Sequence, residues 1–179
     1  MKLEGGCYCG KLRYVAEGDP MFKAQCHCRE CQYISGGGPN FFMLMPPKGF
    51  SYTKGAPKKF FRSDLENAVT REFCAECGTH LTTHRPGLPA VILKAGTLDD
   101  PAMYGSPQSA IFTCDMQAFH AIPEGMPTFE KLPPQRERTT RPPRRRARNG
   151  CWHRDRRSST GRLAHPRRSF RDRSKPALP

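Results

Sequence analysis

Seven of the nine cysteines in this chain fall into three short clusters, and their spacing constrains the fold more than any other feature. The clusters are Cys7-Tyr-Cys9, Cys26-His-Cys28-Arg-Glu-Cys31 and Cys74-Ala-Glu-Cys77. Such short spacings let one backbone turn direct two thiolates at a single metal ion. A closed structural zinc site takes four protein ligands, whereas a reactive site keeps one position open. Seven cysteines therefore predict one zinc site of each type.

The residues alone leave two ways of dividing these cysteines. In the favoured division, Cys26, Cys28 and Cys31 form the open site, and the two remaining pairs close a four-thiolate site. That closed site would join distant parts of the chain and stabilise a small domain with a modest core. In the rival division, Cys74, Cys77 or a histidine supplies a fourth ligand to the triplet.

Disulfide formation is the alternative use of clustered cysteines. The first six residues lack the basic and apolar regions of a secretory signal peptide, and no run approaches the roughly 18 apolar residues of a membrane span. We therefore expect a cytoplasmic protein with no membrane partner, in a reducing compartment where clustered cysteines more often bind metal. A redox role for Cys74 and Cys77 is disfavoured, because no thioredoxin-like strand and helix pattern surrounds them.

The distribution of charge divides the chain near residue 135. Residues 1–135 carry a net charge of +1, and residues 136–179 carry the other +13 of the total of +14. The second segment is rich in Arg, Pro and Ser and poor in large apolar residues, so it cannot bury enough surface to fold. We expect one domain over 1–135 and a disordered basic tail over 136–179. The tail is either a read-through extension, the favoured reading, or an arm that contacts nucleic acid.

The first 135 residues predict a mainly β protein, because short alternating or apolar runs lie between Gly and Pro turns. The expected strands are 11–17, 40–45, 58–62, 69–73, 80–84, 90–94 and, more weakly, 111–114. No long amphipathic helix is expected, but Asp99 or Asp100 could cap a helical turn that begins near Pro101. This pattern is typical of a β-sandwich or a barrel-like body.

Several other polar residues are candidates for lesser roles. His27 lies between two proposed ligands, so its side chain is expected to point away from the metal. His80 and His84 lie in one expected strand and should share a face, where His84 could supply a ligand or relay a proton. Arg29 and Lys23 flank the cysteine triplet and could hold an anionic substrate, although exposed, solvated charge is the favoured reading of each.

The cysteine motifs, in this order, resemble the glutathione-dependent formaldehyde-activating enzyme family, which includes the centromere protein V type. The matching segments are Gly6-Cys-Tyr-Cys-Gly10, Cys26-His-Cys-Arg-Glu-Cys31, Phe73-Cys-Ala-Glu-Cys-Gly-Thr79 and Gly125-Met-Pro-Thr-Phe-Glu130. The resemblance covers residues 3–132. It implies a small, β-sandwich-like zinc fold of the Mss4-like kind.

The resemblance also implies an activity and a set of site residues. The family forms S-hydroxymethylglutathione from formaldehyde and glutathione, so the chain would be a carbon–sulfur lyase with glutathione as co-substrate and two zinc ions. Its partners would be a small-molecule thiol and an aldehyde. The structural zinc would be held by Cys7, Cys9, Cys74 and Cys77, and the catalytic zinc by Cys26, Cys28 and Cys31.

Elementary chemistry agrees with that activity. Zinc with three thiolates is a poor Lewis acid, but it can hold a substrate thiol at its open position and lower the pKa of that thiol. The alternative is a non-enzymatic zinc module whose basic tail contacts nucleic acid. Deleting the chain beyond residue 135 would separate the two: an enzyme would keep its activity, and a tail-dependent binder would lose its affinity.

Overall fold

The computed structural model describes residues 1–134, and within them the protein is mainly β with a single α-helix, α1 (Arg29–Ser35). The strands are β1 (Lys2–Gly6), β2 (Arg13–Glu17), β3 (Phe22–Cys26), β4 (Asn40–Met45), β5 (Phe50–Lys54), β6 (Lys58–Phe60), β7 (Thr70–Phe73), β8 (His80–His84), β9 (Val91–Lys94), β10 (Ser109–Ile111) and β11 (Thr128–Phe129). Four short 3₁₀ segments connect some of these elements. The mainly β fold expected from the sequence is confirmed.

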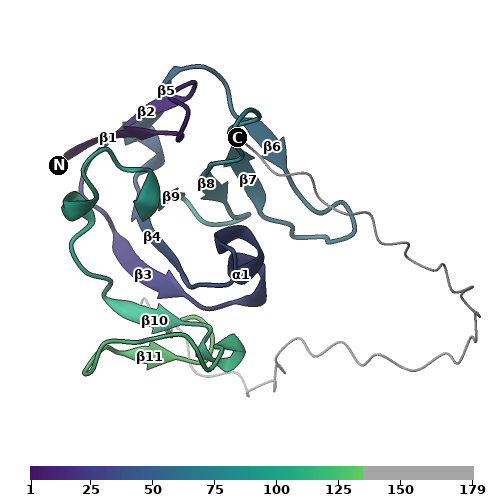
Figure 1. Cartoon of the computed structure of the whole chain (residues 1–179), viewed down its shortest axis with the longest axis vertical. Helices are drawn as coiled ribbons and strands as arrows, with labels where there is room; N and C mark the ends of the chain where they lie inside the picture. The colour runs from purple at the N-terminus through teal and green to yellow at the C-terminus, as the bar shows by residue number, and fades with distance from the viewer. Residues whose placement is uncertain (135–179) are drawn as a thin grey trace, which may run out of the picture. The chain divides into compact units, whose positions relative to one another are not determined.

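The strands form two sheets (Figure 1). The small sheet has the order β1-β2-β5, and the large sheet has the order β11-β10-β3-β4-β9-β8-β7-β6. Both pairs within the small sheet are antiparallel, as are the pairs from β3 to β6 in the large sheet. Among the strands of residues 1–134, only β10 pairs in parallel, with β3 on one side and β11 on the other.

The main core lies between the small sheet and one face of the large sheet. Alternation on β2 turns Tyr14 and Ala16 inward, and both are buried. They share one apolar cluster with Met43 and Met45 of β4 and with Leu93 of β9. Packing of this kind between two sheets is the sandwich arrangement expected for antiparallel strands with one buried face.

The other face of the large sheet carries a second, smaller cluster, and α1 lies beside it (Figure 1). Ala24, Phe42 and Ile111 are its buried apolar members. Cys28 and Cys31 pack against this cluster from the start of α1. The three-cysteine motif therefore lies where the end of β3, α1 and this face of the sheet meet.

Local sequence patterns anticipated some elements and missed others. The apolar run 40–45 and the run 80–84 form β4 and β8 as expected, and Asp100 caps the 3₁₀ segment Pro101–Tyr104 by accepting a hydrogen bond from the Ala102 amide at 3.0 Å. The expected strand at 111–114 is misplaced, because β10 ends at Ile111. No local sequence pattern had indicated α1 or the strands β1, β3, β5 and β11. The expectation about the tail lies outside the described residues.

No helix within residues 1–134 is both long and apolar enough to cross a membrane. In this part of the chain the one α-helix, α1, has seven residues, far fewer than the roughly 20 that span a bilayer.

Candidate metal centres

The structure gathers four cysteines from two distant knuckles into one group. Cys7 and Cys9 follow β1, Cys74 and Cys77 follow β7, and all four sulfur atoms lie within 4.8 Å of one another. The Cys7 and Cys9 sulfurs are 3.5 Å apart, and the Cys9 and Cys74 sulfurs are 3.7 Å apart. A disulfide would need about 2.05 Å, whereas zinc–sulfur bonds of about 2.3 Å in a tetrahedron place two sulfurs about 3.8 Å apart. The donor set and spacing fit a tetrahedral metal ion.

The two knuckles have the same backbone form. The Gly10 amide donates to the Cys7 carbonyl at 3.0 Å, and the Gly78 amide donates to the Cys74 carbonyl at 2.9 Å. Both glycines have a φ of 71°, in the left-handed region that residues with a Cβ rarely adopt. Each glycine closes a tight turn, and this turn directs both sulfur atoms of its knuckle to the same side.

Hydrogen bonds connect the knuckles and support thiolate charge. The Leu12 amide donates to the Cys7 sulfur at 3.2 Å. The Tyr8 amide donates to the Thr79 hydroxyl at 3.1 Å, and that hydroxyl lies 3.1 Å from the Cys77 sulfur. The contact with Thr79 is the main reason why the pKa of Cys77 is lowered to about 5. Lowered thiol pKa values favour metal binding, because the thiolate is the ligand.

The second group contains Cys26, Cys28 and Cys31, whose sulfur atoms also lie within 4.8 Å of one another. Cys26 ends β3, Cys28 is the N-cap of α1, and Cys31 lies in the first turn of that helix. The Cys28 sulfur accepts a hydrogen bond from the Cys31 amide at 3.4 Å. Within residues 1–134, no fourth Cys, His, Asp or Glu joins this group. It therefore offers three ligands where the first group offers four.

The pKa values of these thiols are shifted in different directions. Hydrogen bonds from Cys26 and Cys28 lower the pKa of Cys31 to about 3. The same contacts, with Cys28 and Cys31, raise the pKa of Cys26. The Asn40 amide nitrogen donates to the Cys31 sulfur at 3.7 Å, and it holds this thiolate from the neighbouring strand β4. These contacts thus favour the thiolate of Cys31 and disfavour that of Cys26.

Cationic side chains lie beside this group. Lys94 ends β9 and is buried, and its ammonium nitrogen lies 6.0 Å from the centre of the Phe42 ring. Burial lowers the pKa of Lys94 to about 8, while the nearby cysteine sulfurs act to raise it. Arg71 of β7 forms an ion pair with Glu30 in the first turn of α1. This pair connects the far part of the sheet to the helix that carries Cys31.

His27 is fully buried and points toward the C-terminal part of the domain. Its Nδ1 lies 2.9 Å from Nδ1 of His120, and Nε2 of His120 lies 2.7 Å from the Gly37 carbonyl. His27 is not a member of either cysteine group. The expectation that it points away from the metal ligands agrees with this arrangement, while its pairing with His120 was not foreseen.

His80 and His84 do not share a face, contrary to the sequence expectation. The pairing of β7 with β8 shifts register between Glu72 and Phe73, which inserts a bulge at the start of β8. His84 contacts the Glu72 carboxylate at 3.2 Å, whereas Nε2 of His80 lies 2.9 Å from the Thr82 carbonyl. Burial lowers the pKa of His80 to about 3, so His80 is neutral at physiological pH.

The two cations considered from the sequence have other contacts. The Lys23 ammonium donates to the Tyr104 carbonyl at 2.6 Å, and the Arg29 side chain bonds to Gln32 and lies over the Tyr33 ring. Sequence reasoning missed Lys94 as a neighbour of the triplet. Its signal was a lysine that ends an otherwise apolar strand, a place where charge is seldom buried.

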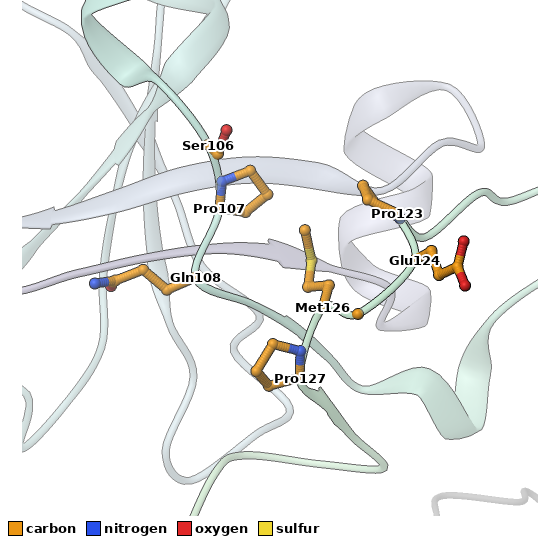
Figure 2. A pocket seen from close by; sticks show the side chains of 8 residues that line it. Ser106, Pro107, Gln108, Pro123, Glu124, Met126 and Pro127 are labelled. Carbon is orange, nitrogen blue, oxygen red and sulfur yellow. The ribbon is translucent and has the colours of Figure 1, made fainter.

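A pocket of about 290 Å³ lies between the segment that precedes β10 and the segment that precedes β11 (Figure 2). None of the clustered cysteines lines it. Its lining consists of Ser106, Pro107, Gln108, Pro123, Glu124, Gly125, Met126 and Pro127. With a single ionisable side chain, it offers no acid–base pair or set of metal ligands.

These features define a class: a mainly β protein with two cysteine groups that could each bind a metal ion. The chain belongs to the glutathione-dependent formaldehyde-activating enzyme family, whose model matches residues 2–115. All seven clustered cysteines lie inside that match. The family resemblance inferred from the sequence is confirmed.

A crystal structure of a Rhodobacter sphaeroides protein from structural genomics is similar at 16% identity, with a TM-score of 0.46, over 59% of this chain and 97% of that chain. No curated protein matches the sequence.

Proposed function

We propose that the protein is a zinc-dependent carbon–sulfur lyase or synthase that forms or cleaves a thiol–aldehyde adduct, with S-(hydroxymethyl)glutathione as the expected product. The observation that carries this proposal is the three-cysteine group, which brings three sulfur atoms within 4.8 Å of one another and includes no fourth ligand from residues 1–134. A closed site needs four ligands, so three leave a position for a substrate. Family membership supports glutathione and formaldehyde as the reactants.

In this proposal the four-cysteine group holds a structural zinc, and Cys26, Cys28 and Cys31 hold a reactive one. The second ion would lower the pKa of a bound substrate thiol, so that the thiol reacts as a thiolate at neutral pH. The thiol donor sets need reduced cysteines, so we place the reaction in the cytoplasm.

The reaction balances without an oxidant or a reductant. The thiol gives its proton to water as it becomes a thiolate, and the thiolate sulfur then forms a bond to the aldehyde carbon. The π-electron pair of the carbonyl moves to oxygen, and that oxygen takes up one proton from water. The reverse reaction breaks the carbon–sulfur bond and releases the same proton. The protein's contribution is to hold the thiolate in place and to exclude competing ligands. Asn40 and the Cys31 amide orient the sulfur atoms at the site.

Exchange NMR tests the reaction, because the uncatalysed addition of thiols to formaldehyde is fast. Formaldehyde, glutathione and their adduct should interconvert faster with the zinc-loaded protein than with the same solution lacking protein. Cys28→Ser should remove the acceleration and leave the protein folded. In cobalt-substituted protein, glutathione should add a sulfur-to-cobalt charge-transfer band. Exchange at the background rate for a panel of aldehydes would refute the enzymatic proposal.

A further inference from the structure

Lys94 is the last residue of β9. Lys94 is opposite Phe42 of β4, and Cys26 of β3 is opposite Asn40 of β4. Because residues two apart on a strand lie on the same face, the side chains of these four residues share one face of the large sheet. This face carries the three-cysteine group, so the ammonium group of Lys94 is on the side of the sheet where the thiolates gather.

Lys94 is buried, and the usual partners of a buried ammonium are missing around it. Only 8% of its surface is exposed. No carboxylate within residues 1–134 forms an ion pair with Lys94, whereas Lys2, Lys11 and Lys59 each pair with a glutamate. A buried charge is costly unless an opposite charge balances it. The sulfur atoms of Cys31, Cys26 and Cys28 are the groups that favour its charged form.

The net charge of the site determines how Lys94 affects the binding of a ligand. Three thiolates and one divalent ion carry one net negative charge. Binding of a thiolate would change the net charge of the site from −1 to −2, and the site is partly buried, where charges interact strongly. The ammonium of Lys94 offsets one of these two negative charges. A neutral ligand such as water or imidazole gains no such benefit.

We propose that Lys94 is the positioning residue that gives the three-cysteine site its preference for an anionic sulfur ligand over neutral ligands. This inference rests on the proposed function, because it assumes that a metal ion and a substrate thiolate meet at this site. Lys94 would supply a preference for anionic ligands that the cysteines cannot supply, since the negative charges of the thiolates repel an anion.

The test uses the full-length protein loaded with cobalt at the three-cysteine site and zinc at the other. Glutathione and imidazole are titrated separately, and each is followed by its effect on the cobalt spectrum. With an effective dielectric constant of about 20, removing a unit charge roughly two strand spacings (about 10 Å) away should weaken thiolate binding by about tenfold or more. Lys94→Met should therefore bind glutathione at least about tenfold more weakly while its affinity for imidazole changes less than about twofold.

Three matched variants separate charge from packing. Lys94→Arg should restore most of the glutathione affinity, because it restores the charge. Lys94→Gln repeats the removal of charge with a polar side chain, in case Lys94→Met does not fold. Lys48→Met removes an exposed lysine and should behave as the unmodified protein. Metal content and thermal midpoint are measured for each variant, so that loss of the site is recognised.

The possible outcomes distinguish the proposed role of Lys94 from the proposed enzymatic reaction. Unchanged glutathione binding in Lys94→Met and Lys94→Gln, with exchange catalysis intact, would overturn the role of Lys94 and leave the proposed function standing. Equal weakening of glutathione and imidazole would also overturn it, because only packing would then be lost. Selective loss of thiolate binding in a protein that never accelerates exchange would support Lys94 and refute the enzymatic proposal. An unmodified protein that binds no thiol would refute both.

Discussion

At the scale of single residues, the two cysteine groups differ in how far apart in the sequence their members lie. Cys74 is 2% exposed and belongs to the main core between the sheets. Cys9 and Cys74 are 65 residues apart in sequence, with their sulfurs 3.7 Å apart. The triplet spans only residues 26–31, so a metal bound there closes a much shorter loop. Closing a long loop removes more entropy from the unfolded chain than closing a short one.

We therefore predict that serine substitutions in the two groups have unequal effects. Cys74→Ser should lose the structural ion and with it a large part of the roughly 10–16 kcal/mol that a structural zinc contributes in zinc-finger peptides, so the domain should unfold or aggregate. Cys28→Ser should stay folded and lose one of two zinc ions. Metal analysis and circular dichroism measure both effects.

Cys114 lies outside both groups, and Cys114→Ser serves as the control that should keep two ions. Mild chelation should remove one ion from the unmodified protein without unfolding it. A protein that binds a single zinc and releases it only on global unfolding would contradict the division into a structural and a reactive site.

At the scale of secondary-structure elements, Glu72 of β7 connects the two sheets. Its carboxylate accepts a hydrogen bond from the Tyr52 hydroxyl of β5 at 2.9 Å and from the Thr82 hydroxyl of β8 at 2.8 Å. His84 and Lys59 also contact it, at 3.2 Å and 3.4 Å. Burial acts to raise the pKa of Glu72, but the hydrogen bonds from Thr82, His84 and Tyr52 outweigh it, so the pKa is lowered.

This network predicts a pH-dependent contribution to stability. A carboxyl whose folded pKa is depressed stabilises the fold above its unfolded pKa and loses that contribution as the pH falls through the folded value. Glu72→Gln should therefore lower the free energy of unfolding by about 1–3 kcal/mol at pH 7. The difference from the unmodified protein should shrink as the pH falls below the ordinary Glu value of 4.5.

Urea unfolding of zinc-saturated protein at several pH values measures this difference. Glu66→Gln changes an exposed glutamate and should have almost no effect across the same range. A Glu72→Gln deficit that stays constant down to pH 3 would show that packing, not ionisation, is responsible.

At the scale of the whole molecule, the described residues contain both sheets, both cysteine groups and the whole family match. Nearly all of the net positive charge lies elsewhere, since residues 136–179 carry +13 of the +14. We propose that residues 1–135 form the zinc-binding domain and that residues 136–179 contribute neither to its stability nor to its reaction.

A chain that ends at Pro134 should accordingly keep its melting temperature within about 2 °C, which corresponds to a few tenths of a kcal/mol for a domain of this size. It should also keep its zinc content and its acceleration of exchange. Differential scanning calorimetry and exchange NMR measure these properties. A large fall in melting temperature would show that the tail packs on the domain, and a loss of nucleic-acid affinity on truncation would favour the binding-module alternative.

Several elements could be predicted because their signals are local. The run 40–45 is apolar and bounded by Gly and Pro residues, so it forms β4 with the expected ends. By contrast, α1 has seven residues and a cysteine as its N-cap, and it gives no helical period for a sequence pattern to detect. The bulge at the start of β8 depends on pairing with β7, which is why the shared face expected for His80 and His84 is wrong.

The sequence by itself predicted the number and type of candidate metal ligands, because a short cysteine spacing brings two thiols to one side of a turn whatever surrounds it. It also determined the mainly β class and the family. Only the tertiary structure decided which knuckles meet and which other side chains lie near the triplet. Asn40 and Lys94 reach it through the pairing of β3 with β4 and of β4 with β9. Such pairing is set by the burial of whole sheet faces, a property of distant strands together and not of any one segment.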